Sequence, residues 1–322
     1  DASSGTAKRA DGTGGRCLND LVCKGKVETL HLINMLLRFK VGRHAITGDL
    51  TQFYNSCKLK PNQWNLQRFL FREDLNPDSE ILEFVITTLI YGVKCVSAQT
   101  EHAIALLADH IKENYPELAN FLIRSRYCDD MGDSRAVKEE LYQLAADADL
   151  NFAKVGLKCK VWTMSETSPS EEASVDGVTV NVGGINWFPE VDAIETKIPL
   201  LHFSKKRRGR LPENTKFFDG KVMNIEDFVP KKLTRTHVTS KLASVFDFMG
   251  HLAPMLSGLK SDLREVVQHT IGWKDSMPDF LRNKWLKNFL KLETLRGLKF
   301  HRPIMPADAI DTLSLIHISE PT

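Results

Sequence analysis

The feature that most constrains this chain is a pair of adjacent aspartates, Asp129 and Asp130, in the string Tyr127-Cys128-Asp129-Asp130. Apolar residues precede the pair, and Met131-Gly132-Asp133-Ser134 follows it, a pattern typical of a turn between two strands. Neighbouring carboxylates repel each other, so a confined turn tolerates them only when a cation or basic side chains neutralise their charge. Mg²⁺ is the usual cation for such oxygen ligands when it also shares substrate phosphates. The pair therefore predicts a hairpin tip that binds Mg²⁺.

A third acid is expected to join this pair, because a two-metal site needs a carboxylate from elsewhere to hold ions roughly 3.5 to 4 Å apart. The candidate is Asp49, which ends the apolar, β-favouring approach at 45–48 and precedes a helix-compatible stretch. The alternative is that Asp129 and Asp130 are solvated turn or helix-cap residues, which is what most Asp-Asp pairs are.

Composition is that of an ordinary soluble globular protein. The chain has 322 residues, 42% hydrophobic and 26% charged, which suffices for two or three subdomains. The formal net charge of +2 conceals a compact basic block. The members of this block that are expected to bind nucleic-acid phosphates in a salt-sensitive manner are Lys205, Lys206, Arg207 and Arg208. The alternative interpretation is a solvated loop.

Cysteine usage favours a reducing, intracellular compartment. Six cysteines occur without any Cys-x-x-Cys pair, which argues against a structural zinc site and a disulfide framework. No apolar run reaches membrane-spanning length and no secretory leader opens the chain, so no membrane partner is expected. The abrupt, small and polar start at 1–15 suggests a piece of a longer polypeptide.

Periodicity predicts alternating strands and helices in the first half and mainly helices in the second. The expected helices are one within 17–40, one capped by Ser97, and those at 136–152, 239–271 and 278–298. The expected strands are 67–72, a buried 81–91, 121–127, 157–162 and 178–187. Residues 163–177, rich in Ser, Glu and Pro, are the best linker candidate.

This order of strand, acid, helix, strand, paired acids and return strand resembles the palm of reverse transcriptases. The sequence looks most similar to the Bel-Pao group of long-terminal-repeat retrotransposons, from Asp1 to about Thr312. The residues that carry the resemblance are Asp1-Ala2-Ser3-Ser4 with Cys17-Leu18-Asn19-Asp20, Gly48-Asp49-Leu50 with Phe53-Tyr54, Gln67-Arg68-Phe69-Leu70, Tyr127-Cys128-Asp129-Asp130, Gly183-Gly184-Ile185-Asn186-Trp187 with Asp192, Phe246-Asp247 with Gly250 and Ala253-Pro254, and Gly272-Trp273-Lys274-Asp275.

The resemblance implies an α+β chain with the right-hand fold of reverse transcriptases. A palm with an antiparallel sheet and helices, and partial fingers, would be followed by a mainly helical lobe similar to a thumb or connection. The implied boundaries are 1–47 for partial fingers, 48–190 for the palm, 191–238 for a basic linker or connection, 239–310 for the helical Pao-type lobe, and 311–322 for a non-native tail.

The resemblance also assigns roles to single residues. Asp49, Asp129 and Asp130 would hold two Mg²⁺ ions, for which Mn²⁺ could substitute. Leu50 would make a backbone contact to the triphosphate, and Tyr54 would be the steric gate under the sugar. Gly92, Ser97 and Gln99 would lie in the segment that holds the templating base and incoming nucleotide. Lys160 would be the acid that protonates pyrophosphate. Tyr54 as a core aromatic and Lys160 as a plain surface lysine are the alternatives.

The implied activity is RNA-directed DNA polymerisation from deoxynucleoside triphosphates (dNTPs). The expected partners are an RNA template, the RNA–DNA hybrid, dNTPs, and the protease, ribonuclease H and integrase parts of the same polyprotein, in a cytoplasmic virus-like particle. The alternatives are a catalytically inactive nucleic-acid-binding remnant and an aspartic-type peptidase region. The peptidase is disfavoured because neither Asp-Thr-Gly nor Asp-Ser-Gly occurs.

Five features depart from the family pattern. Cys128 replaces a usual Val, Ser97-Ala98 a usual Ser-Pro, and Phe248 a usual Pro. The fingers strand that brings a Lys and an Arg to the triphosphate would precede Asp1, so this chain by itself is expected to bind nucleotide weakly. Residues 313–322 fit neither the family nor the preceding pattern.

Overall fold

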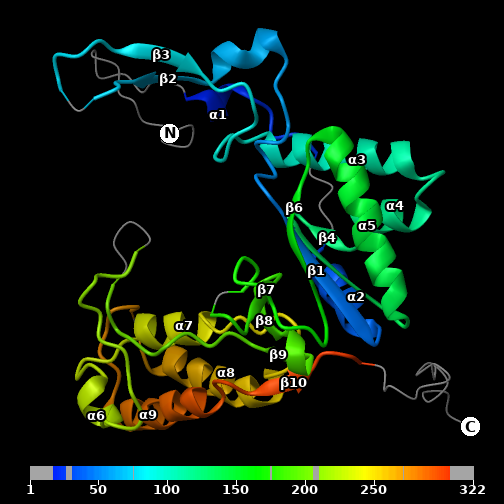
Figure 1. Ribbon diagram of the computed structural model, residues 1–322. Helices are drawn as coiled ribbons and strands as arrows, with labels where there is room; N and C mark the ends of the chain where they lie inside the picture. The colour runs from blue at the N-terminus through cyan, green and yellow to red at the C-terminus, as the bar shows by residue number, and fades with distance from the viewer. Residues whose placement is uncertain are drawn as a thin grey trace, which may run out of the picture. The chain divides into compact units, whose positions relative to one another are not determined.

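The computed structural model describes residues 17–26, 31–74, 76–174, 176–205, 210–270 and 272–304. The chain forms two compact units (Figure 1): unit 1 comprises residues 1–173 with 303–322, and unit 2 comprises 174–302. The division lies inside the 163–177 segment that composition marks as a linker. The mixture of helices and sheets fits the α+β class.

Unit 1 is built on a four-stranded antiparallel sheet in the order β4-β5-β1-β6. Its strands are β1 (His44–Leu50), β4 (Arg126–Tyr127), β5 (Asp130–Arg135) and β6 (Cys159–Met164). Three helices, α3 (Val96–Ile111), α4 (Pro116–Arg124) and α5 (Lys138–Val155), form a common core with one face of this sheet through side chains that include Leu50 and Met131. The short hairpin β4–β5 confirms the expected turn at the paired aspartates.

Helix α2 (Leu32–Val41) packs beside β5, mainly through buried Met35, Leu36 and Phe39. Ser134 ties the two elements together, because its hydroxyl donates to the carbonyl of Arg38 and accepts from the N–H of Gly42 at 2.7 Å. Side chains alternate along a strand, so Ser134 and Asp130 leave β5 on the opposite face from Met131. The acids therefore project from the face that α2 shares, away from the α3–α5 core.

Asp133 is the buried acid of this sheet. Arg135 Nη1 lies 2.9 Å from Asp133 Oδ2, yet the N–H is not aligned to donate, and Oδ2 has no hydrogen-bond partner among the described residues. Burial raises the pKa of Asp133, against the opposing charge of Arg135. A raised carboxyl pKa means that the folded state favours the protonated form, so stability from this group is complete below the ordinary pKa and is lost as pH rises through the folded pKa.

Asp133→Asn is therefore expected to raise the free energy of unfolding at pH 7 and to have little effect near pH 3, because the buried carboxylate is charged only at the higher pH. Denaturant unfolding at the two pH values measures the difference. A destabilised Asn variant at pH 7 would show instead that the ion pair with Arg135 outweighs the burial of the charge.

A smaller part of unit 1 contains α1 (Leu18–Leu21), the 3₁₀ helix η1 (Pro61–Leu66) and a two-stranded sheet, β2 (Arg68–Phe71) with β3 (Leu82–Val85). The β2 strand agrees with the expected 67–72. The buried strand expected at 81–91 is wrong, because β3 is only four residues long and Phe84 and Val85 are exposed. β-branched and aromatic residues indicate fit to a pleated surface, which need not be an interior one.

Two other expectations in unit 1 are also wrong. Residues 116–124 form helix α4 where a strand was expected at 121–127, because Pro116 starts a helix and the apolar residues Leu118, Phe121 and Leu122 recur at helical spacing on its buried side. Ser97 is not a cap, since α3 begins at Val96 with Cys95 in the N-cap position.

Unit 2 combines a second antiparallel sheet, in the order β10-β9-β8-β7, with helices that share one core around Trp285 and Phe289 (Figure 1). Its strands are β7 (Val180–Val182), β8 (Ile185–Phe188), β9 (Ala193–Glu195) and β10 (Lys299–His301). Its helical elements are η2 (Pro189–Val191), α6 (Ile225–Phe228), α7 (Arg235–Ala243), α8 (Ala253–His269) and α9 (Asp279–Thr294).

The long helix expected at 239–271 is divided into α7 and α8. Pro254 lies in the first turn of α8, and a proline cannot supply the N–H that a continuous helix would need there. The strand expected at 178–187 is a hairpin, β7–β8, whose tip is Gly183-Gly184. The mainly helical character of the later residues agrees with the sequence.

Candidate active site

The pairing of β1 with β5 brings the distant acids together. Asp49 is the direct cross-strand partner of Asp130, and the N–H of Leu50 donates to the carbonyl of Asp129 at 3.0 Å. Directly opposed residues on antiparallel strands project from the same face, with Cβ atoms roughly 5 Å apart. Asp49 and Asp130 therefore share one face at the end of the sheet, and Asp129 lies beside them in the tip.

The other neighbour of β1 brings Lys160 to the same place. Gly48 pairs with Trp162 and Leu50 with Cys159, so two residues of β6, Lys160 and Val161, oppose the single residue Asp49. Such a bulge re-aims side chains and is common beside active sites. Gly48 permits this close approach, because a Cβ there would lie 2.7 Å from the Trp162 ring and 2.6 Å from Cys159 Sγ.

The electrostatics agree with this clustering. Burial and the negative charge of Asp129 raise the pKa of Asp49, while the ammonium group of Lys160 opposes the rise. Carboxylate oxygens with excess negative charge, beside a sheet end, suit a hard cation such as Mg²⁺. Among the described residues, no three Asp, Glu, His or Cys side chains are already arranged to hold a metal.

Two tyrosines stand beside the acids. The ring of Tyr54 meets that of Tyr91 edge-on, with centroids 4.6 Å apart and planes at 89°. Burial, and then the negative charges of Asp129 and Asp49, raise the pKa of Tyr91, although 71% of this residue is exposed. Nothing in the sequence assigns a functional role to Tyr91 except its position next to Gly92, which the resemblance places in the segment that holds the nucleotide.

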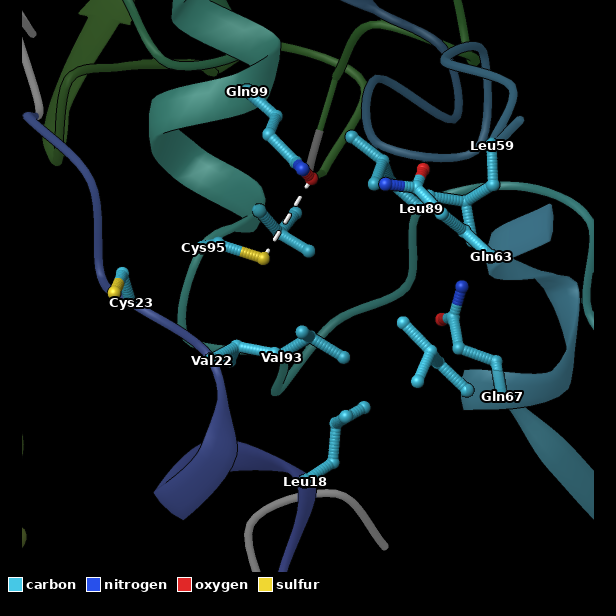
Figure 2. Close-up of a pocket in the computed structure, with 12 residues that line it drawn as sticks. Leu18, Val22, Cys23, Leu59, Gln63, Gln67, Leu89, Val93, Cys95 and Gln99 are labelled. Carbon is cyan, nitrogen blue, oxygen red and sulfur yellow. Dashed lines mark hydrogen bonds between the residues drawn. The ribbon is translucent and has the colours of Figure 1, made fainter.

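The segment expected to hold the nucleotide runs from a turn at Gly92 into the first turn of α3, where Gln99 lies. Gly92 has a left-handed φ of +91°, and its carbonyl accepts a 2.7 Å hydrogen bond from the Asn19 side chain. Gln99 instead lines a pocket of about 260 Å³ between α1, η1 and α3 (Figure 2). Its Oε1 lies 3.7 Å from Cys95 Sγ in a hydrogen bond. None of Asp49, Asp129 and Asp130 lines this pocket.

The basic block belongs to unit 2 and is described only in part. Lys205 lies close enough to α7 that its charge, after burial and the charge of Lys241, lowers the pKa of His237. Lys206, Arg207 and Arg208 lie outside the described residues. The nucleic-acid-binding role of the block stays a prediction.

A model of the Pao retrotransposon-like RNaseH-like domain matches residues 234–321. A Pao/Bel retrotransposon polyprotein is thereby supported. The matched region begins just before α7 and runs through α8, α9 and β10, and it extends over the closing residues that the sequence pattern set apart. The match covers residues 234–302 of unit 2 and residues 303–321, and it does not include the paired acids. No curated protein matches the chain.

The matched description names an RNaseH-like domain, which suggests a family of nucleic-acid-processing enzymes and implies nucleic-acid binding and other polyprotein parts. Helices of the described residues are all too short or too polar to cross a membrane.

Proposed function

We propose that this chain is the RNA-directed DNA polymerase part of a Pao/Bel-type retrotransposon polyprotein. The observation that carries the proposal is the register of β1 against β5, which sets Asp49 opposite Asp130 beside the tip residue Asp129. Strand-end acids brought together from two distant segments, with a lysine in the adjoining bulge, suit nucleotidyl transfer with two Mg²⁺ ions.

The proposed reaction joins a primer 3′-oxygen to the α-phosphorus of a dNTP, breaks the bond from that phosphorus to the bridging oxygen, and releases pyrophosphate. Bound Mg²⁺ supplies Lewis-acid activation of the hydroxyl and neutralises the triphosphate charge. The chain itself contributes Asp49, Asp129 and Asp130 as ion ligands. Lys160 lies in the bulge opposite Asp49, and in this proposal it would give the departing oxygen a proton.

The aromatic pair has a role in this proposal as well. The ring of Tyr54 makes an edge contact with Tyr91, and its centroid lies 5.5 Å from that of Phe53. These two contacts hold the ring near the acids. A ring in this position suits the surface under the incoming sugar, where a 2′-hydroxyl would collide with it. The template is paired by base complementarity, so the protein is expected to contact backbone and helix shape more than base identity.

A second candidate is a nucleic-acid-binding remnant without polymerase chemistry. The match at 234–321 favours it, because that match concerns an RNaseH-like domain and does not include the acids of unit 1. An aspartic peptidase has no comparable support, since the required tripeptide is missing from the sequence.

Primer extension separates these candidates. The chain is assayed by itself and with upstream polyprotein sequence restored, on an RNA template with a DNA primer, dNTPs and Mg²⁺. We expect extension with the restored chain, abolished when Mg²⁺ is replaced by a chelator. Salt-sensitive binding of the hybrid without extension would support the remnant instead. Cleavage of a peptide library without extension would support the peptidase.

A further inference from the structure

Arg126 is a buried charge directly behind the paired aspartates. It lies on β4, two residues before the turn, and its side chain is only 5% exposed. The guanidinium donates to both carboxylate oxygens of Glu101 on α3, from Nη1 at 3.2 Å and from Nη2 at 2.5 Å. Glu101 is almost as buried, with 10% of its side chain exposed. This bidentate contact fixes the plane of the guanidinium relative to α3.

The same guanidinium also holds the turn. Nη1 donates to the backbone carbonyl of Cys128 at 2.5 Å. Cys128 has a φ of +55°, in the left-handed region that non-glycine residues seldom occupy, so its conformation depends on contacts around it. The backbone carbonyl of the next residue, Asp129, accepts a hydrogen bond from the N–H of Leu50. A chain of contacts thus runs from Glu101 through Arg126 and the turn to β1.

A third contact reaches the segment that follows Asp49. The Cζ atom of Arg126 lies 5.5 Å from the ring centroid of Phe53, which adjoins Tyr54. One buried cation therefore touches α3, the hairpin tip and the residues between Asp49 and Tyr54. These are the elements whose relative positions decide whether the acids and the aromatic pair face one point.

A stabilising ion pair alone would not explain this arrangement. Buried ion pairs gain little or nothing over well-packed apolar side chains of similar size, because desolvation offsets their attraction. An apolar side chain, however, could not donate to the Cys128 carbonyl. The hydrogen bond to the turn is thus the contribution that requires an arginine, and Glu101 is the residue that orients it.

We propose that Arg126, oriented by Glu101, is a positioning residue that fixes the turn carrying Asp129 against β1. The inference rests on the proposed polymerase function for its catalytic consequence, while its structural part concerns only the turn. It predicts that loss of the guanidinium lowers kcat for primer extension and leaves the dNTP KM nearly unchanged, since Arg126 lies behind the acids and not at the substrate.

Arg126→Met tests this most directly, because methionine retains apolar volume and cannot donate. The expected result is a fall in kcat of about 100-fold, the size typical of an Å-scale misplacement of a catalytic group, with KM changed by less than about threefold. Hydrogen exchange of the 322-residue chain supplies a second readout. The Leu50 amide, which bonds to Asp129, is expected to exchange at least about tenfold faster than in the wild type.

Glu101→Gln is the second variant, needed if Arg126→Met does not fold. Glutamine keeps an acceptor for Arg126 but loses the charge, so kcat is expected to fall by about tenfold, in the range found for outer-sphere partners. The matched control is Arg135→Met, on the same sheet and also in ion pairs, with Glu117 at 3.3 Å and Asp133 at 2.9 Å. It should leave Leu50 exchange and kcat at wild-type values, whatever its effect on overall stability.

The outcomes distinguish the two proposals. Unchanged Leu50 exchange in both Arg126→Met and Glu101→Gln, or acceleration equal to that in Arg135→Met, would overturn the positioning role. Absence of extension by the wild-type restored chain would overturn the polymerase proposal, and the exchange data would still decide whether Arg126 holds the turn. A rise in KM with unchanged kcat would also contradict positioning, because it would mean that Arg126 binds substrate.

Discussion

Replacement of either Asp49 or Asp129 by asparagine is expected to reduce Mg²⁺-dependent primer extension by about 1000-fold or more. Asparagine keeps the size of the side chain but loses the anionic oxygens that a hard cation requires. Lewis-acid assistance is worth several kcal/mol, and about 1.4 kcal/mol corresponds to a tenfold change in rate. Single-turnover extension on an RNA template measures the loss. The matched control is Asp78→Asn, in an exposed loop, which should extend normally.

The same Asp49→Asn variant is expected to be slightly more stable than the wild type at neutral pH without divalent ions. Burial and Asp129 raise the pKa of Asp49, so its stabilising contribution is complete below the ordinary pKa and is lost as pH rises through the folded pKa. The gain should be about 0.5 kcal/mol at pH 7, typical of exposed charge pairs, and should vanish near pH 3. An inactive but stabilised variant would assign the lost activity to chemistry and not to unfolding. If Asp49→Asn retained a tenth of the wild-type primer extension, Asp49 would not be one of the proposed ion ligands.

The acid-bearing elements were predictable because their signals are local. A β-favouring run that ends at Asp49, and an aromatic residue before two aspartates, each specify a short backbone segment. Their meeting depends on register, which is not local. A slip of one residue between β1 and β5 would send Asp49 and Asp130 to opposite faces, and only packing of Leu50 and Met131 into the helical core excludes it.

Elements whose state depends on tertiary contacts were predicted less well. Residues 121–124 are apolar enough for a strand, and only the wider pattern from Pro116 reveals the buried side of a helix. The exposure of β3 depends on what packs against it, and the sequence Leu82-Glu83-Phe84-Val85 does not report that. The domain boundaries and the role of every site residue stay predictions.

The contact between Arg126 and Glu101 illustrates the same limit at the level of single residues. The two are 25 positions apart, on a strand and a helix, and nothing in either local sequence marks them as partners. Tyr91 was missed for a different reason. It occupies a loop beside Gly92, and its nearness to the acids emerges only in the folded chain, where the charges of Asp129 and Asp49 raise its pKa after burial.

Asp192→Ala is expected to destabilise unit 2 by about 3 to 5 kcal/mol, the range typical of removing one partner from a buried ion pair. Arg302 is fully buried, and its Nε and Nη2 donate to the two oxygens of Asp192 at 2.7 and 2.8 Å. The indole N–H of Trp187 donates to the same carboxylate at 3.0 Å. Alanine would also have to adopt the φ of +45° at this position, which aspartate tolerates better. Denaturant unfolding, with hydrogen exchange of β8 and β9 to localise the change, measures the effect.

A matched control comes from Glu293 and Arg296, which are paired at 2.7 Å one helical turn apart but partly exposed. Glu293→Ala should cost less than about 0.5 kcal/mol, because solvent already screens that pair. The decisive variant is the double replacement Asp192→Asn with Arg302→Met. It should cost less than Asp192→Ala alone, since the penalty arises from leaving a buried guanidinium without its carboxylate. A double variant at least as unstable as Asp192→Ala would show instead that the ion pair itself stabilises β8, β9 and the end of β10.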